Sequence, residues 1–199
     1  MQCQRNYRDV ARWLGGAAAK KGLGKEMLMF SIRPESVPDD ALLRTYRGGR
    51  HPERWGTYQD CFSVTVGRNV ALSDFVYAFY TSPVFRLERL ILRAVIGARS
   101  TDADARAVAD GDGAAFAAWT VAERTATQLL MCDRYEATRS WFRVVPLENA
   151  GTTLQFGSGV AARSSGVGGP RTLGFVFRLM LGFHVVYSQT LLWAASKRV

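Results

Sequence analysis

The side chain best placed to do chemistry is His184, because it interrupts a long apolar run. Residues 173–195 are almost all apolar, and the other ionisable residue that breaks this run is Arg178. Histidine titrates near neutral pH, so His184 beside a cavity would bind the polar group of a ligand or act as a general base. The alternative is a structural histidine, hydrogen-bonded to a strand carbonyl or to a tyrosine hydroxyl.

Three further candidates lie in segments that alternate as strands do. Arg139 and Trp141 share one side of segment 138–145, where they would form a pocket corner for an anion and an aromatic group. The alternative is that Trp141 packs in the core and Arg139 pairs with a carboxylate. Asp60 lies in segment 58–66. If Asp60 points inward, it is a costly buried carboxylate that needs a partner, and hence a candidate acid or base.

Arg178 and Tyr187 complete the candidate ligand-binding residues. Arg178 shares a narrow helical stripe with small residues that include Gly174 and Gly182. It would bind an anionic head group there, contact a neighbouring element, or face solvent in an ion pair. Tyr187 lies in the same apolar run as His184 and is the other candidate there.

Several other chemistries find no support in the sequence. The two histidines lie far apart and the three cysteines are isolated, so no metal site, disulfide framework or cofactor is expected. The glycines near residue 157 lack the context of a phosphate-binding loop. Serine, histidine and aspartate are all present, but no nucleophile-elbow pattern supports a hydrolase triad. Cys61 and Cys132 are predicted to be small core residues.

The composition is that of an ordinary globular protein with a basic surface. The chain has 199 residues and a formal net charge of +9, which suits an acidic partner or an anionic membrane surface. The basic residues are scattered rather than interleaved with aromatic residues, so nucleic-acid binding is not expected. No secretory signal is recognisable, and we expect a cytoplasmic protein.

The elements that position the candidate residues follow a simple order along the chain. Segment 58–66 is predicted to be a strand, and a pair of helices follows it, separated by a break at Ser82 and Pro83. Gly157 and Gly159 within the last strand indicate a bulge, a bend or the close approach of another backbone. The predicted elements are a helical turn over 41–46 capped by Asp39 and Asp40, helices from 72, over 84–96 and from 101, strands over 58–66, 116–123, 126–132, 138–145 and 152–161, and one long helix over 173–195.

This order predicts an α+β fold in which an antiparallel sheet wraps around the long C-terminal helix, with a helical pair inserted after the first strand. Residues 1–26 are basic and rich in glycine and alanine, and they are predicted to be a flexible segment. Residues 27–199 are predicted to form a single domain.

The chain resembles the START-like, or helix-grip, superfamily, and in particular its small bacterial members of unknown function. The resemblance rests on the strand that begins Tyr58-Gln-Asp-Cys-Phe, the helical pair through Phe85-Arg-Leu-Glu-Arg-Leu, the strand Thr138-Arg-Ser-Trp141, and Gly182-Phe-His-Val-Val-Tyr187. It covers about residues 57–198 and implies an apolar cavity between the sheet and the last helix. Fewer strands are visible than in the full superfamily pattern, so residues 27–33 supply another strand or the sheet is reduced.

Three functions follow from these observations. The resemblance implies a protein that binds a small hydrophobic or amphipathic ligand in the cavity. The second function is an enzyme on the same scaffold, of the cyclase, dehydratase or isomerase type, which would use His184, Arg139 or Asp60. The third is a membrane-attached protein in which residues 173–195 span the bilayer, although His184 makes insertion costly. Peripheral contact with a membrane and the oligomeric state stay open.

Overall fold

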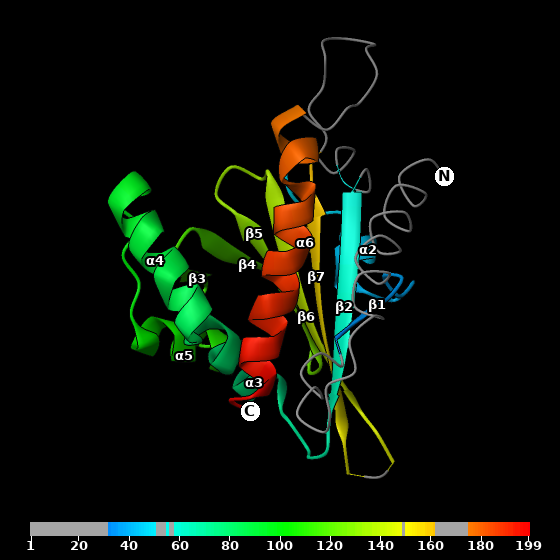
Figure 1. The fold of residues 1–199 in the computed structure, drawn as a ribbon. Helices are drawn as coiled ribbons and strands as arrows, with labels where there is room; N and C mark the ends of the chain where they lie inside the picture. The colour runs from blue at the N-terminus through cyan, green and yellow to red at the C-terminus, as the bar shows by residue number, and fades with distance from the viewer. Residues whose placement is uncertain (1–31, 51–54, 56–57, 149, 162–174) are drawn as a thin grey trace, which may run out of the picture.

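The computed structural model describes residues 32–50, 55, 58–148, 150–161 and 175–199. For residues 175–183 it describes the backbone but not the side chains. The described residues form an α+β fold, as predicted. A seven-stranded antiparallel sheet curves around a long C-terminal helix (Figure 1). The predicted flexible segment 1–26 lies outside the described residues.

The sheet combines one early strand with a later meander. Its strand order is β1-β2-β7-β6-β5-β4-β3, and every neighbouring pair is antiparallel. Strand β2 therefore lies beside β7, the last strand, and the chain between β2 and β3 forms helices. The strands are β1 (Arg33–Pro34), β2 (Tyr58–Val66), β3 (Ala115–Phe116), β4 (Trp119–Arg124), β5 (Gln128–Asp133), β6 (Thr138–Pro146) and β7 (Thr152–Val160).

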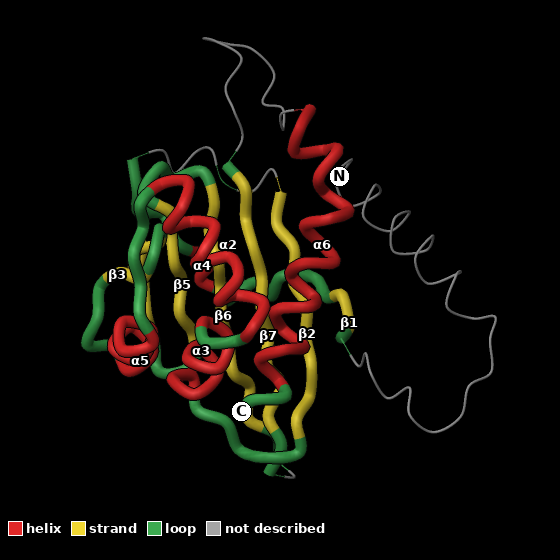
Figure 2. Tube along the Cα trace, turned by 60° about the vertical axis from the view of Figure 1, so that its left-hand side comes forward, coloured by secondary structure: helices red, strands yellow, loops and turns green. Residues whose placement is uncertain are grey.

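Helices cover both faces of the sheet, but unequally. Helices α3 to α6 lie on one face, with α6 running along β2 and β7, whereas the short helix α2 packs on the opposite face against β5, β6 and β7 (Figure 2). The predicted helical pair, α3 and α4, follows β2, the first long strand. The helices are α2 (Leu42–Thr45), α3 (Leu72–Tyr80), α4 (Pro83–Ile96), α5 (Asp102–Asp110) and α6 (Phe175–Ser196).

Local signals in the sequence explain where the helices between β2 and β3 begin and end. Ser82 caps α4, since its hydroxyl accepts a hydrogen bond from the backbone N–H of Phe85, and Pro83 occupies the first helical position. Thr101 opens α5 in a capping box with Asp104. Helix α4 ends at Gly97, which adopts a left-handed conformation with φ 69°.

The cap predicted for α2 is wrong. Ala41, which has no side-chain capping group, precedes α2. The two aspartates form ion pairs instead, Asp39 with Arg44 and Asp40 with Arg143. An arginine within reach competes with the helix terminus for each carboxylate, and the bidentate pair of Arg143 with Asp40, at 2.9 Å for both bonds, holds the loop before α2 against β6.

Two hydrophobic clusters lie on opposite faces of the sheet. The larger cluster lies between the sheet and helices α3 to α6, and it contains the aromatic residues Phe62, Phe79 and Phe142. The smaller cluster lies under α2 and contains Leu43, Cys61, Leu130 and Trp141. Alternation along β2 and β6 therefore delivers apolar side chains to both faces, which is why both faces carry helices.

The two glycines of β7 accommodate α2. Strands β2 and β7 pair in continuous register through Gly157 and Gly159, so the glycines mark a close approach rather than a bulge. A Cβ atom on Gly157 would lie 2.7 Å from the carbonyl oxygen of Asp60, 3.0 Å from the Trp141 ring and 3.3 Å from the Leu43 side chain. The absence of side chains here lets α2 pack closely on the sheet.

Helix α6 is the long C-terminal helix that the sequence predicts, and the structure describes it over Phe175–Ser196. Its second half is part of the larger cluster through Leu191, Leu192 and Ala195, which are at most 3% exposed. Within the described part of the chain, no helix has the length and apolar character needed to cross a membrane.

Candidate functional site

The polar cluster at the interface of β2, β7 and α6 is centred on Asp60. The Asp60 side chain is only 2% exposed, because β2 directs it towards α6 rather than into solvent. Its carboxylate accepts three hydrogen bonds: from the backbone N–H of Ser158 at 2.8 Å, from the Ser158 hydroxyl at 2.7 Å and from the Tyr58 hydroxyl at 2.8 Å. Asp60 and Ser158 are opposite each other in the β2–β7 register. The buried charge is thus stabilised by donors that the sheet itself positions.

His184 joins this cluster from α6. Its Nε2 atom lies 2.7 Å from the Ser158 hydroxyl and 3.3 Å from Asp60 Oδ2, and its ring meets the Tyr58 ring edge to face at 6.1 Å. Because Ser158 gives its single hydroxyl proton to Asp60, the Nε2–H of His184 is the donor to the serine oxygen. The His184 side chain is 29% exposed, so it is the member of the cluster that solvent or a ligand can reach.

The geometry differs from that of a nucleophilic serine triad. In such a triad the carboxylate holds the histidine nitrogen remote from the serine, and the near nitrogen takes the serine proton. Here Asp60 and Ser158 both lie next to the same atom, Nε2 of His184. Asp60 also accepts the serine proton directly. The cluster is therefore suited to binding a polar group or moving a proton rather than to activating Ser158.

Tyr187 lies on the same helix as His184 but faces a different partner. Its hydroxyl donates a hydrogen bond to Glu88 Oε2 on α4. Burial raises the pKa of Glu88, and the hydrogen bond from Tyr187 offsets part of this rise. Burial, together with the nearby Glu88 charge, raises the pKa of Tyr187. The pair links α4 to α6.

Arg139 and Trp141 lie on the opposite face of the sheet from His184 and Asp60. Trp141 is fully buried in the smaller cluster under α2, and its indole N–H donates to Gln128 Oε1 at 2.8 Å. The sequence prediction placed all six candidates around one cavity under the C-terminal helix, but the sheet separates these two residues from that helix. The reason is strand parity, because odd-numbered residues of β6 face α2 whereas even-numbered residues of β2 face α6.

Arg139 is 1% exposed, and aromatic rings are prominent among its described contacts. Its guanidinium stacks on the Trp55 ring, with 3.8 Å between Cζ and the ring centroid, and Nη2 donates to the carbonyl oxygen of Gly48 at 3.1 Å. Among the residues that the structure describes, its Nε and Nη1 atoms have no hydrogen-bond partner. Desolvation lowers the pKa of Arg139. Within the described part of the chain, aromatic rings rather than an ion-paired carboxylate contact the Arg139 guanidinium, so the pairing that the sequence suggested as the alternative is not seen there.

The remaining chemical expectations concern Arg178, metals and thiols. Arg178 belongs to α6, but its side chain lies outside the described residues. Among the described residues, no group of three or more His, Cys, Asp or Glu side chains is arranged to hold a metal ion. Cys61 and Cys132 are buried, as predicted. Burial raises the pKa of Cys61 to about 12, so this thiol is a poor nucleophile at neutral pH.

The sequence did not single out Ser158 or Tyr58 as site residues. Tyr58 is two residues from Asp60 in an alternating strand, so a shared face was predictable, and the structure confirms it. Ser158 sits between two glycines, and only the pairing of β2 with β7 brings it opposite Asp60. That register depends on contacts about a hundred residues apart, which local patterns do not encode.

Comparison with known proteins gives no further assignment: no family model, curated protein or solved structure matches this chain.

Proposed function

We propose that this chain is a START-like protein that binds a small hydrophobic or amphipathic ligand between its sheet and α6. The polar group of the ligand would contact His184, backed by Asp60, Ser158 and Tyr58. The observation that carries the proposal is this polar cluster, which is held on a largely apolar sheet face and includes one partly exposed member. Ligand sites of this kind are mostly apolar and contain a few placed polar groups.

The arrangement of elements supports the same function. The sheet curves around α6, and the chain continues from β7 to α6, which is the order that the superfamily resemblance implies. The aromatic side chains Phe62, Phe142 and Phe156 of the larger cluster make this face of the sheet apolar. Arg139 and Trp141 take no part in the proposed site, because they lie under α2.

The second candidate is an enzyme that uses the same cluster, and one contact favours it. His184 Nε2 lies 3.3 Å from a carboxylate that is 2% exposed, and Ser158 bridges the two groups. A histidine paired with a buried carboxylate is well suited to take up and release a proton. The reaction would be a proton transfer such as a cyclisation, dehydration or isomerisation, with His184 as the base.

The experiment is a displacement titration with anilinonaphthalene sulfonate, a dye that fluoresces in apolar sites. We expect saturable dye binding that a mixed lipid extract reverses. His184→Ala and Ser158→Ala are expected to weaken dye or lipid binding while leaving the fold intact. The His184 side chain is partly exposed, and in Ser158→Ala the backbone N–H of residue 158 still donates to Asp60.

The matched control is Gln59→Ala, which changes the neighbouring residue on the opposite face of β2. Gln59 donates to the carbonyl oxygen of Leu43 and faces α2. This variant is expected to bind the dye as the wild type does. Equal losses in Gln59→Ala and His184→Ala would contradict the proposed location, and the absence of saturable binding would contradict the proposed function.

A further inference from the structure

Helix α4 has a stripe of apolar side chains on its solvent-exposed face. Leu87, Leu90, Ile91 and Val95 recur at helical spacing and are 60%, 62%, 54% and 74% exposed, respectively. Phe85 is the residue of α4 that is buried in the core. An amphipathic helix normally buries its apolar stripe. Large apolar side chains that share one exposed face mark a surface that binds something.

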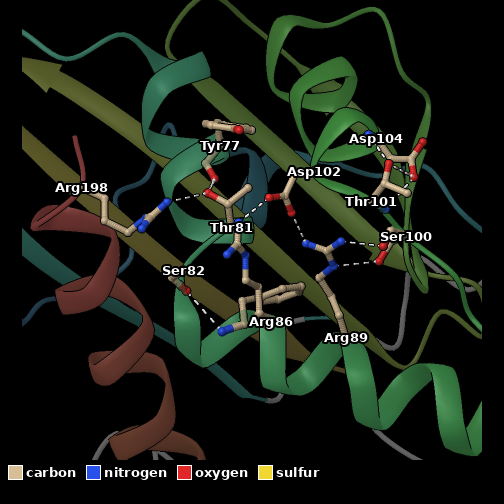
Figure 3. A network of polar contacts seen from close by, with 11 residues as sticks. Tyr77, Thr81, Ser82, Arg86, Arg89, Ser100, Thr101, Asp102, Asp104 and Arg198 are labelled. Carbon is tan, nitrogen blue, oxygen red and sulfur yellow. Dashed lines mark hydrogen bonds and ion pairs between the residues drawn. The ribbon is translucent and has the colours of Figure 1, made fainter.

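Polar contacts on the other side of α4 fix this orientation (Figure 3). Arg89 donates to Asp102 Oδ1 at 2.6 Å and to the Ser100 hydroxyl at 3.1 Å, and Arg86 forms an ion pair with the same aspartate. Glu88 accepts the hydrogen bond from Tyr187 on α6. The side of α4 that carries Arg89 and Glu88 therefore faces α5 and α6, and the apolar stripe faces outward.

Basic residues border the exposed stripe. Arg86 and Arg93 lie on α4 beside Leu90, and Arg99 lies two residues after Gly97, the residue at which the helix ends. Neither Arg93 nor Arg99 forms an ion pair with a carboxylate within the described part of the chain. The acidic residue of α4, Glu88, is half-buried against α6 and has a raised pKa. The border is therefore cationic, in keeping with the net charge of +9.

We propose that the outer face of α4 docks on an anionic membrane surface. Leu87, Leu90, Ile91 and Val95 would enter the boundary between head groups and acyl chains, while Arg93 and Arg99 bind lipid phosphates or carboxylates. The charge selects this occupant over a second copy of the chain, because pairing two α4 faces would bring arginine borders of the same sign together. The inference rests on α4 alone and is independent of the proposed ligand site.

The test is co-sedimentation of the full chain with vesicles of equimolar phosphatidylserine and phosphatidylcholine, and with vesicles of phosphatidylcholine alone. We expect binding to the anionic vesicles that weakens as salt is added. Leu90→Glu combined with Ile91→Glu is expected to reduce the partition coefficient at least about tenfold. Arg93→Glu is expected to reduce it about fivefold or more.

The control is Tyr135→Ser, which removes another exposed apolar side chain, 68% exposed, from the turn between β5 and β6. This variant is expected to bind vesicles like the wild type, and circular dichroism checks that every variant is folded. Equal binding to both vesicle types, or binding unaffected by the α4 substitutions, overturns the proposal. Self-association in the absence of vesicles that Leu90→Glu abolishes also overturns it, in favour of a second copy as the occupant.

Discussion

Replacing Asp60 with alanine is expected to lower the free energy of unfolding, and the size of the effect follows from the hydrogen bonds that the Asp60 carboxylate accepts. The substitution removes the acceptor of three buried hydrogen bonds, which come from the backbone N–H and the hydroxyl of Ser158 and from the hydroxyl of Tyr58. Each unsatisfied buried donor costs about 1–3 kcal/mol. Removing a buried charge also relieves its desolvation cost, which offsets part of this loss. The expected decrease in the free energy of unfolding is therefore about 2–4 kcal/mol.

The assay is urea unfolding followed by circular dichroism. Further variants, each of which removes a smaller part of the cluster, are expected to show smaller decreases in the free energy of unfolding. Ser158→Ala keeps the backbone bond to Asp60 and lets His184 approach the carboxylate directly, so about 0.5–1.5 kcal/mol is expected. Tyr58→Phe removes one hydrogen bond and is expected to cost about 1 kcal/mol. The control is Thr65→Ala on the same strand, where the exposed hydroxyl is expected to contribute less than about 0.5 kcal/mol.

Two results would refute this reasoning. One is a loss for Asp60→Ala below about 1 kcal/mol with an unchanged dependence on urea, which would mean that the carboxylate is not the shared acceptor. The other is a loss for Ser158→Ala as large as that for Asp60→Ala, which would make the serine rather than the aspartate the centre of the cluster.

Three further predictions concern packing and pH. Gly157→Ala is expected to cost about 1–3 kcal/mol, because its methyl group would overlap the backbone and side chains packed on β7, and a thermal melt equal to wild type would contradict the close approach. Glu88 has a raised pKa in the fold, so the stability of the wild type relative to Glu88→Gln should fall as pH rises from the ordinary glutamate range through the folded pKa. Urea titrations at several pH values measure this difference. A difference that stays constant with pH would contradict the burial of Glu88 against Tyr187. The hydrogen bond from Arg89 is the main cause that lowers the pKa of Asp102, so the stability contributed by Asp102 should be present above the ordinary aspartate range and disappear as pH falls through the folded pKa. Asp102→Asn should lack this acid-dependent loss and cost up to about 1 kcal/mol at neutral pH, since the pair is partly exposed, and an acid titration identical to that of wild type would contradict the prediction.

Much of the fold was predictable because its signals are local. Alternation predicted β2 over 58–66, which is the strand that forms, and the break at Ser82 and Pro83 predicted the division between α3 and α4. The apolar run predicted α6, which the structure describes over Phe175–Ser196. Each of these signals acts over a few residues, through side-chain periodicity or through a cap.

The site was predicted only in part, because it depends on contacts between distant segments. His184 and Asp60 were identified by their chemical type in apolar surroundings, and the structure brings them to 3.3 Å. Ser158 was missed because its role follows from the pairing of β7 with β2. Trp141 packs in the core, as one of the two alternatives held, but on the face that α2 covers, because alternation groups residues by face without saying which face meets α6. The covering of the second face by α2 depends on the close packing that Gly157 permits.

The most direct test of the proposed ligand site is a comparison of native and denatured masses for protein purified without detergent and then incubated with a mixed lipid extract. The proposed function predicts a native mass above that of the bare chain, with a small hydrophobic molecule released on denaturation. It also predicts a lower fraction of bound molecule in His184→Ala than in Gln59→Ala. A bare mass in every sample, or equal occupancy in the two variants, would contradict a site between the sheet and α6.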